Sequence, residues 1–188
     1  NRSNINPLRV LVGNSSAETN RHIEIFEILK KYCGNRMEII CPLGYPEKNP
    51  EYRDLVIKKG VECFGDSFVP ITSIIPLEKY TQLLDTIDVL VFNQPRQQGL
   101  FNLYYLLFHG KKIYLSKEST TFSMLKDLDI EIFDVNIINS ISFEEFAYMS
   151  IESRKMNVYI AQENLSHEKS VLCWNELFHK YYHSLLSQ

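Results

Sequence analysis

The sequence has 188 residues, which suits one globular domain, and its 45% hydrophobic and 23% charged residues are typical of a folded chain. Twenty basic and twenty-three acidic side chains give a formal net charge of −3, so no global positive field is available to drive non-specific binding to nucleic acid. Composition and charge therefore exclude disordered, collagenous and coiled-coil chains and predict no nucleic-acid partner.

The cysteines and the apolar runs indicate the compartment. The four cysteines lack CxxC spacing and three lie in or beside apolar segments, so we interpret Cys33, Cys41, Cys63 and Cys173 as reduced, structural thiols. No apolar run approaches the roughly 18 residues that span a bilayer, and the first residues lack a signal-like stretch. These features indicate a cytoplasmic protein. An apolar strand is reached by Val10 with almost no leader, so we expect a fragment of a longer protein.

Short apolar runs alternate along the chain with segments of helical periodicity. The predicted strands are, in order, 9–12, 37–41, 69–75, 88–92, 112–115 and 130–135. The predicted helices are 23–32, 52–59, 77–87, 99–109, 120–128, 142–149 and 167–186. The fourth strand ends in the uninterrupted apolar run Val89-Leu90-Val91-Phe92, which is typical of a parallel strand buried on both faces.

This alternation predicts the fold class. Strands that alternate with helices form a parallel sheet covered on both faces, with right-handed crossovers. No linker, repeat or low-complexity tract divides the chain. We therefore predict an α/β fold, a Rossmann-like, doubly wound parallel sheet of about six strands, with residues 1–188 as a single domain. In such a sheet the ligand lies beyond the carboxyl ends of the strands, so the loops after strands one, two, four and five are the candidate sites.

The loop after the first strand is Gly13-Asn14-Ser15-Ser16. Ser15 and Glu18 fit a capping box, in which a plain cap with nothing bound and backbone N–H groups that face a phosphate are alternatives. The loop has neither the GxGxxG fingerprint nor a Walker lysine. This argues against a nicotinamide dehydrogenase and against a P-loop NTPase.

The loop after the second strand, Pro42-Leu43-Gly44-Tyr45-Pro46, has the composition of a rigid turn. Gly44 permits backbone geometry that other residues avoid, and Tyr45 could present its ring and hydroxyl to a ligand. From spacing alone, a turn with a packed tyrosine is the favoured alternative.

The loop after the fourth strand, Arg96-Gln97-Gln98-Gly99, opens a helix. A guanidinium beside a helix N-terminus is a good receptor for a diphosphate, because its two donated hydrogen bonds and the backbone dipoles act together. Gln97 and Gln98 carry donors and acceptors suited to sugar hydroxyls. The alternative is an exposed, solvated triplet.

The closing helix carries weaker signals. His179 and His183 have the spacing of a zinc pair, yet no third ligand is identifiable, so we predict no metal. For the aromatic stripe of this helix we expect core packing, with a membrane-surface face as the alternative. The stripe consists of Trp174, Phe178, Tyr181 and Leu185, with Leu177 and Tyr182 beside it.

Four ordered motifs together resemble one family. They are Val12-Gly13-Asn14-Ser15, Asn20 with His22, Pro42-Leu43-Gly44-Tyr45-Pro46 with Asn49 and Tyr52, and Arg96-Gln97-Gln98-Gly99. Over 8–135 the chain is similar to the TDP-N-acetylfucosamine:lipid II N-acetylfucosaminyltransferases of enterobacterial common antigen synthesis, which are 4-alpha-L-fucosyltransferase-like. The resemblance implies a GT-B arrangement of two Rossmann-like domains, of which this chain is the C-terminal, donor-binding half. The donor site that it implies consists of Gly13, Asn14, Ser15, His22, Gly44, Tyr45, Arg96, Gln97, Gln98 and Gly99.

The resemblance also implies a mechanism and partners. Arg96 and the helix N-termini would neutralise charge on the nucleoside diphosphate as the glycosidic bond breaks, so no metal or other cofactor is expected. The implied partners are a TDP-sugar donor and a lipid-linked glycan acceptor, the latter held by an absent N-terminal half that carries any general base. This chain alone would bind without turnover, in the bacterial cytoplasm or peripherally on the inner face of the plasma membrane. A non-catalytic Rossmann-like binding or regulatory module is the alternative function, and the missing nucleophile elbow disfavours an intact hydrolase.

Overall fold

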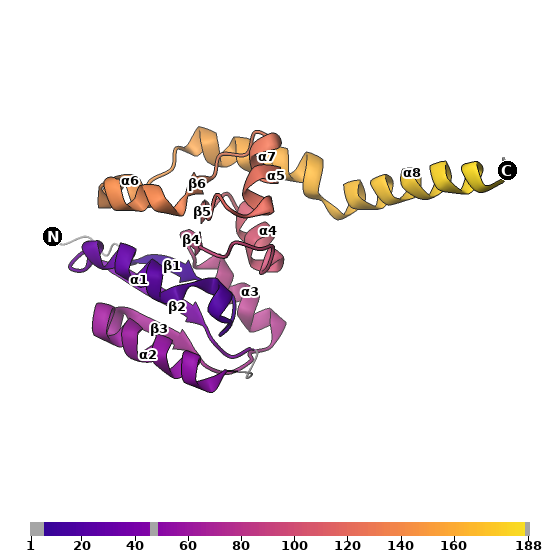
Figure 1. Ribbon diagram of the computed structural model, residues 1–188. Helices are drawn as coiled ribbons and strands as arrows, with labels where there is room; N and C mark the ends of the chain where they lie inside the picture. Colours follow the sequence, from indigo (N-terminus) through magenta and orange to yellow (C-terminus); the bar gives the residue numbers. More distant parts are fainter. Residues whose placement is uncertain (1–5, 46–48, 187–188) are drawn as a thin grey trace.

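The computed structural model describes residues 6–45 and 49–186, with side chains as far as residue 182, and has a central sheet between helical layers (Figure 1). The strands are β1 (Leu8–Val12), β2 (Met37–Pro42), β3 (Phe68–Ile71), β4 (Val89–Phe92), β5 (Lys112–Leu115) and β6 (Phe133–Asp134). The α-helices are α1 (His22–Leu29), α2 (Pro50–Phe64), α3 (Leu77–Asp85), α4 (Leu100–Phe108), α5 (Thr120–Asp127), α6 (Phe143–Ala147), α7 (Ile151–Leu165) and α8 (His167–Leu186). Short 3₁₀ helices are η1 (Glu18–Asn20), η2 (Lys30–Tyr32), η3 (Gly65–Ser67) and η4 (Val135–Ser140).

The sheet is parallel throughout, with the strand order β3-β2-β1-β4-β5-β6. In the register, Val10 of β1 pairs with Ile39 of β2 on one side and with Val89 of β4 on the other. The chain therefore winds outward from β1 in one direction and from β4 in the other. This arrangement confirms the predicted doubly wound, Rossmann-like fold. The carboxyl ends of β1 and β4 flank the point of reversal, where such sheets bind their ligands.

Successive strand residues face two apolar cores, one on each side of the sheet. Val10 and Val12 pack in the core that α1 covers, where Ile25 and Phe26 have no exposed surface. Leu11 points to the opposite core, which α4 covers together with α3 and α5. Burial of each such large side chain contributes about 1.5–3 kcal/mol, so both faces stabilise the sheet. All residues of β4 are buried, as its apolar run predicts.

Two strands are shorter than predicted. Strand β3 ends at residue 71 rather than 75, because its partner β2 ends at Pro42, opposite Ile71. Strand β6 comprises only Phe133–Asp134 of the predicted 130–135. Upstream, the N–H and C=O of Glu131 bond to the side-chain amide of Asn157 at 2.8 and 2.9 Å. Because this side chain occupies backbone groups that a ladder would need, the edge strand starts late.

Helix α7 lies in 150–166, a segment for which no element is predicted from the sequence. Its buried residues are Asn157 and Ala161, so it carries almost no apolar periodicity. It is anchored by the hydrogen bonds of Asn157, and Ser150 caps its first turn by accepting from Ser153 N at 3.0 Å. A polar anchor of this kind is invisible to a search for an apolar stripe. The neighbouring α6 is shorter than the predicted 142–149, because the backbone is already extended at residue 148.

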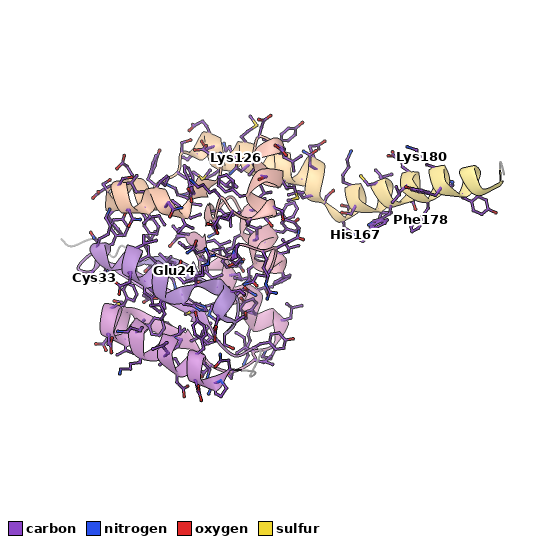
Figure 2. All side chains as sticks on the ribbon, in the orientation of Figure 1. Glu24, Cys33, Lys126, His167, Phe178 and Lys180 are labelled. Carbon is purple, nitrogen blue, oxygen red and sulfur yellow. The ribbon has the colours of Figure 1, made fainter. Side chains whose placement is uncertain are left out.

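Helix α8 has the predicted bounds but projects away from the sheet (Figure 1). The side chains of Trp174, Phe178 and Tyr181 are 58%, 64% and 63% exposed, so the expected core packing of the stripe is wrong. The rings of Trp174 and Phe178 stack at 5.8 Å, while Lys180 projects from the opposite side of the helix (Figure 2). The helix is therefore amphipathic with an exposed aromatic face. The side chains of His183 and Leu185 and all of Pro46 lie outside the described residues.

The cysteines are all free, but only Cys41 of β2 is buried. Cys33 and Cys173 are exposed and Cys63 is half-buried, so the thiols are unpaired as interpreted, but the apolar segments beside these three do not bury them. Cys33 and Cys63 lie at element ends, where an apolar neighbourhood in sequence does not imply burial. None of the helices in the described part of the chain combines the length and hydropathy of a bilayer span.

Candidate functional site

One buried asparagine orders the loop after β1. Gly13 ends the strand with a φ of +68°, in the left-handed region that favours glycine. Asn20 is fully buried, and its Nδ2 donates to the carbonyl oxygens of Ser15 and Ala17 at 3.0 and 3.1 Å. Its Oδ1 accepts from the backbone N–H of Asn14 at 3.2 Å. The protein itself therefore holds this loop in shape.

The predicted capping box of Ser15 and Glu18 does not form. Helix α1 begins only at His22, after Arg21 in the left-handed region at a φ of 52°. The hydroxyl of Ser15 accepts from the buried Asn20 side chain at 3.1 Å and from Ala17 N at 3.4 Å, and η1 begins after Ala17 without a side-chain cap. Glu18 Oε1 accepts from the Asn49 side chain at 2.6 Å, which joins η1 to the start of α2. The buried side-chain amide of Asn20, rather than a capping box, therefore holds the backbone of this loop.

The side chain of His22 packs against Gly13 of this loop. Its side chain has no exposed surface, and its Nδ1 lies 3.2 Å from Tyr52 Oη. Burial lowers the pKa of His22 to about 4, so the ring is neutral at neutral pH. Its Nε2 has no partner among the described residues and faces Gly13, where an added Cβ would lie 2.5 Å away. His22 thus packs behind the loop, with no surface of its own exposed to a ligand.

Hydrogen bonds of the Gln98 side chain connect the loop after β4 to the loop after β1. Arg96 Nε donates to Gln98 Oε1 at 3.0 Å, and the same oxygen accepts from Thr19 Oγ1 at 3.0 Å. Gln98 Nε2 donates to Asn14 Oδ1 at 3.4 Å and to Asn20 Oδ1 at 3.2 Å. A single side chain therefore connects the Arg96 guanidinium to the Gly13 turn.

Gly99 permits the close approach of these two loops. Its φ is +67°, and an added Cβ would lie 2.9 Å from the side chain of Asn14 and 2.9 Å from that of Phe92. Gln97 is exposed beside it. The structure thus gathers most of the sequence-predicted residues at the reversal point of the sheet. The gathered residues are Gly13, Asn14, Ser15, Arg96, Gln97, Gln98 and Gly99.

Gly44 and Tyr45 line a cavity next to this junction. The cavity has a volume of about 260 Å³ and lies between the ends of β1, β2 and β3 and the first turn of α4. Asn14 and Gly99 also line it, so it opens beside the bonded loops. The backbone N–H of Ser16 donates to Tyr45 O at 2.8 Å, which fixes the second loop against the first. Tyr45 itself is 67% exposed, so the alternative of a packed tyrosine is wrong.

More than half of the residues that line this cavity lie outside the predicted site loops. The segment 73–75, Tyr80 and Phe101 line it, and the predicted strand to residue 75 had concealed the loop after β3. Burial raises the pKa of Tyr80 to about 12, against a hydrogen bond with Asn102 that lowers it. The rings of Tyr80 and Phe101 stack at 6.4 Å. The Pro76 that follows is a loop signal that could have marked this segment.

The charges at this edge favour an anion. Arg96 is exposed and forms no ion pair within the described ranges, whereas the nearby Arg21 pairs with Glu118 at 3.1 Å. The first backbone N–H groups of α4 follow Gly99 directly and add a positive dipole end. In the part of the chain that the structure describes, no group of three or more His, Cys, Asp or Glu residues is suited to hold a metal ion. The arrangement can therefore receive a phosphate or diphosphate through N–H donors.

Solved glycosyltransferases share this fold. The chain is similar to an alpha,alpha-trehalose-phosphate synthase (UDP-forming) from Burkholderia vietnamiensis, with a TM-score of 0.73 and 9% identity over 96% of this chain and 44% of that one. It is similar to a glycosyltransferase from Rickettsia africae, with a TM-score of 0.69 and 10% identity over 95% and 48%. It is also similar to the C-terminal domain of a glycosyl transferase group 1 family protein from Francisella tularensis, with a TM-score of 0.68 and 9% identity over 86% and 89%.

The domain therefore has the fold of a GT-B glycosyltransferase half, and the chain spans less than half the length of the first of these relatives. The family follows from a match of the amino-acid sequence to a family model. Residues 1–169 match the 4-alpha-L-fucosyltransferase family, glycosyl transferase group 56, and the chain belongs to it. The resemblance that the four motifs carry is confirmed.

Proposed function

We propose that this chain is the nucleotide-sugar-binding domain of a transferase that moves an amino-deoxy sugar, such as N-acetylfucosamine, from a TDP-sugar to a lipid-linked glycan. The reaction would serve bacterial cell-surface polysaccharide synthesis, as in enterobacterial common antigen. The observation that carries the proposal is the bonded junction of Arg96, Gln98 and Asn14 at the reversal point of the sheet. Membership of the 4-alpha-L-fucosyltransferase family supports the reaction class.

The diphosphate of the donor would bind at this junction. The Arg96 guanidinium uses Nε on Gln98, which leaves its two terminal nitrogens for phosphate oxygens. The N-terminal N–H groups of α4 add donors on the adjacent side. As the bond from sugar to phosphate breaks, negative charge grows on the diphosphate, and these fixed donors stabilise it without a metal ion.

The nucleoside would occupy the cavity of about 260 Å³ beside the junction. Tyr45 and Phe101 are 67% and 49% exposed at its mouth and offer ring faces for stacking. The loop 73–75 offers backbone donors and acceptors for the edge of a base. The residues at this edge therefore suit each part of a nucleoside diphosphate.

A part of the protein outside this chain would bind the acceptor and supply any general base. The chain covers 89% of an isolated C-terminal glycosyltransferase domain but only 44% and 48% of two longer enzymes, which supports this division. The exposed aromatic face of α8 supports peripheral contact with the inner face of the plasma membrane, because Trp and Tyr favour the headgroup region.

Isothermal titration with TDP and UDP tests the proposal. We expect TDP to bind and an Arg96→Ala variant to bind at least tenfold more weakly, since a charge-assisted hydrogen bond contributes about 1.5–3 kcal/mol. Arg36→Ala is the matched control, because Arg36 is exposed before β2, at the opposite end of the strands. If neither nucleotide binds at millimolar concentration, or if Arg96→Ala binds like the parent, a non-catalytic binding module is the better account.

A further inference from the structure

A second, smaller cavity lies between the loops after β4 and β5. Its volume is about 10 Å³, which is room for one water-sized group. Its polar wall includes Gln94, Thr121 and Ser119, and Leu103 and Leu115 form an apolar side. Two residues of the proposed diphosphate site also line it, Arg96 and Gln98. The small cavity therefore adjoins the proposed diphosphate site.

Two buried oxygens at this cavity lack partners. Gln94 and Thr121 are 4% and 5% exposed, and neither Gln94 Oε1 nor Thr121 Oγ1 has a hydrogen bond within the described residues. The amide of Gln94 is oriented by its other atom, because Nε2 donates to Gln98 O at 3.1 Å. If the Gln94 amide were flipped, its Oε1 would face the carbonyl oxygen of Gln98, and neither atom could donate a hydrogen bond. Buried polar atoms are nearly always paired, so two such atoms on one cavity mark a place for a polar group, either a water or a group of a ligand.

The third polar side chain at this cavity is already satisfied. Ser119 Oγ donates to Ser116 O at 2.9 Å and accepts from Phe122 N at 3.2 Å, which caps α5. Apart from Arg96 and Gln98, which the proposed diphosphate site uses, the cavity offers one amide oxygen, which only accepts, and one hydroxyl, which can donate. A group that donates to Gln94 and accepts from Thr121 satisfies both, and a hydroxyl does so at the size of one water.

We propose that this cavity binds one hydroxyl group of the sugar on the nucleotide donor, with Gln94 Oε1 as acceptor and Thr121 Oγ1 as donor. The inference rests on the proposed function and deepens it, since it assigns two residues that select the sugar rather than the nucleotide. The apolar wall of Leu103 and Leu115 would exclude a charged substituent at that position. A sugar without this hydroxyl leaves both oxygens unpaired and binds more weakly.

The test replaces the hydroxyl of Thr121 with a methyl group of equal size. We expect Thr121→Val to weaken binding of TDP-N-acetylfucosamine about tenfold and to leave the affinity for TDP unchanged, because TDP lacks the sugar. The midpoint of thermal unfolding should stay equal or rise, since an unpaired buried hydroxyl is removed. Thr120→Val, at the exposed neighbouring position, is the matched control, and Thr121→Ser should retain sugar binding.

Analogues of the donor that each lack one ring hydroxyl complete the test. One of them should bind the parent and Thr121→Val equally, because the hydroxyl that Thr121 contacts is already gone. The inference is overturned if Thr121→Val binds TDP-N-acetylfucosamine like the parent, or if TDP and the TDP-sugar weaken together. Failure of the parent to bind TDP at all overturns the proposed function, and this inference with it. Binding of TDP with no effect of Thr121 on the sugar overturns only the inference.

Discussion

Replacing Gly13 with alanine tests the packing of the loop on His22. At a φ of +68° the left-handed backbone costs an alanine about 1–2 kcal/mol. The added Cβ would also lie 2.5 Å from His22 Nε2 and 3.3 Å from Asn20 Cγ, so it meets buried side chains from two directions. Such overpacking costs about 1–3 kcal/mol. We therefore expect Gly13→Ala to lower the free energy of unfolding by about 2–5 kcal/mol in total.

Urea unfolding followed by circular dichroism measures this loss. Gly110→Ala is the matched control, because Gly110 has a φ of +64° but its added Cβ would approach no atom nearer than 3.4 Å. It should lose only the backbone part, about 1–2 kcal/mol. In a second variant, His22→Ser added to Gly13→Ala should relieve the clash. Equal losses for Gly13→Ala and Gly110→Ala would refute the argument that His22 packs against the loop.

Three further predictions concern the same site and its supports. Burial lowers the pKa of His22 to about 4 from 6.5, so the unfolded chain binds a proton at this residue between these pH values and the folded chain does not. The free energy of unfolding is therefore constant with respect to His22 above pH 6.5 and falls by at most about 3 kcal/mol as the pH drops toward 4. In urea titrations, the His22→Gln variant should lose less of its free energy of unfolding over this pH range than the parent. Gln98→Ala removes the connection between the loops and should weaken TDP binding at least tenfold by titration calorimetry, while Gln162→Ala, at an exposed position of α7, binds like the parent. Asn157→Leu removes both hydrogen bonds to Glu131 and should cost about 2–4 kcal/mol in urea unfolding; a loss under 0.5 kcal/mol would contradict its role as the anchor of α7.

The sheet was predictable because most of its strands are short apolar runs that alternate with segments of helical periodicity. Val89-Leu90-Val91-Phe92 is buried on both faces, and a run of this kind has few alternatives to a central parallel strand. Helix α7 was not predictable in this way, because Asn157 anchors it through two hydrogen bonds instead of an apolar stripe. The exposure of Trp174 could not be predicted either, since helical spacing gives the face of a residue but not what lies opposite it.

At the site, the sequence identified the residues better than their roles. Arg96 and Asn14 were predicted to share an edge because parallel strands end there, and the structure brings them together through Gln98. The sequence could not predict that Asn20, rather than a capping box, orders the first loop, because both patterns fit the same polar run. It also missed the segment 73–75, since the end of β3 depends on where β2 stops.

A crystal structure of this chain with TDP tests the central claim most directly. The account predicts that the diphosphate lies within hydrogen-bond distance of the Arg96 guanidinium and of the backbone N–H groups at the start of α4, with Asn14 beside it. It further predicts the base in the cavity beside Tyr45. TDP bound elsewhere, or an Arg96 side chain that makes no contact with either phosphate, would contradict the account.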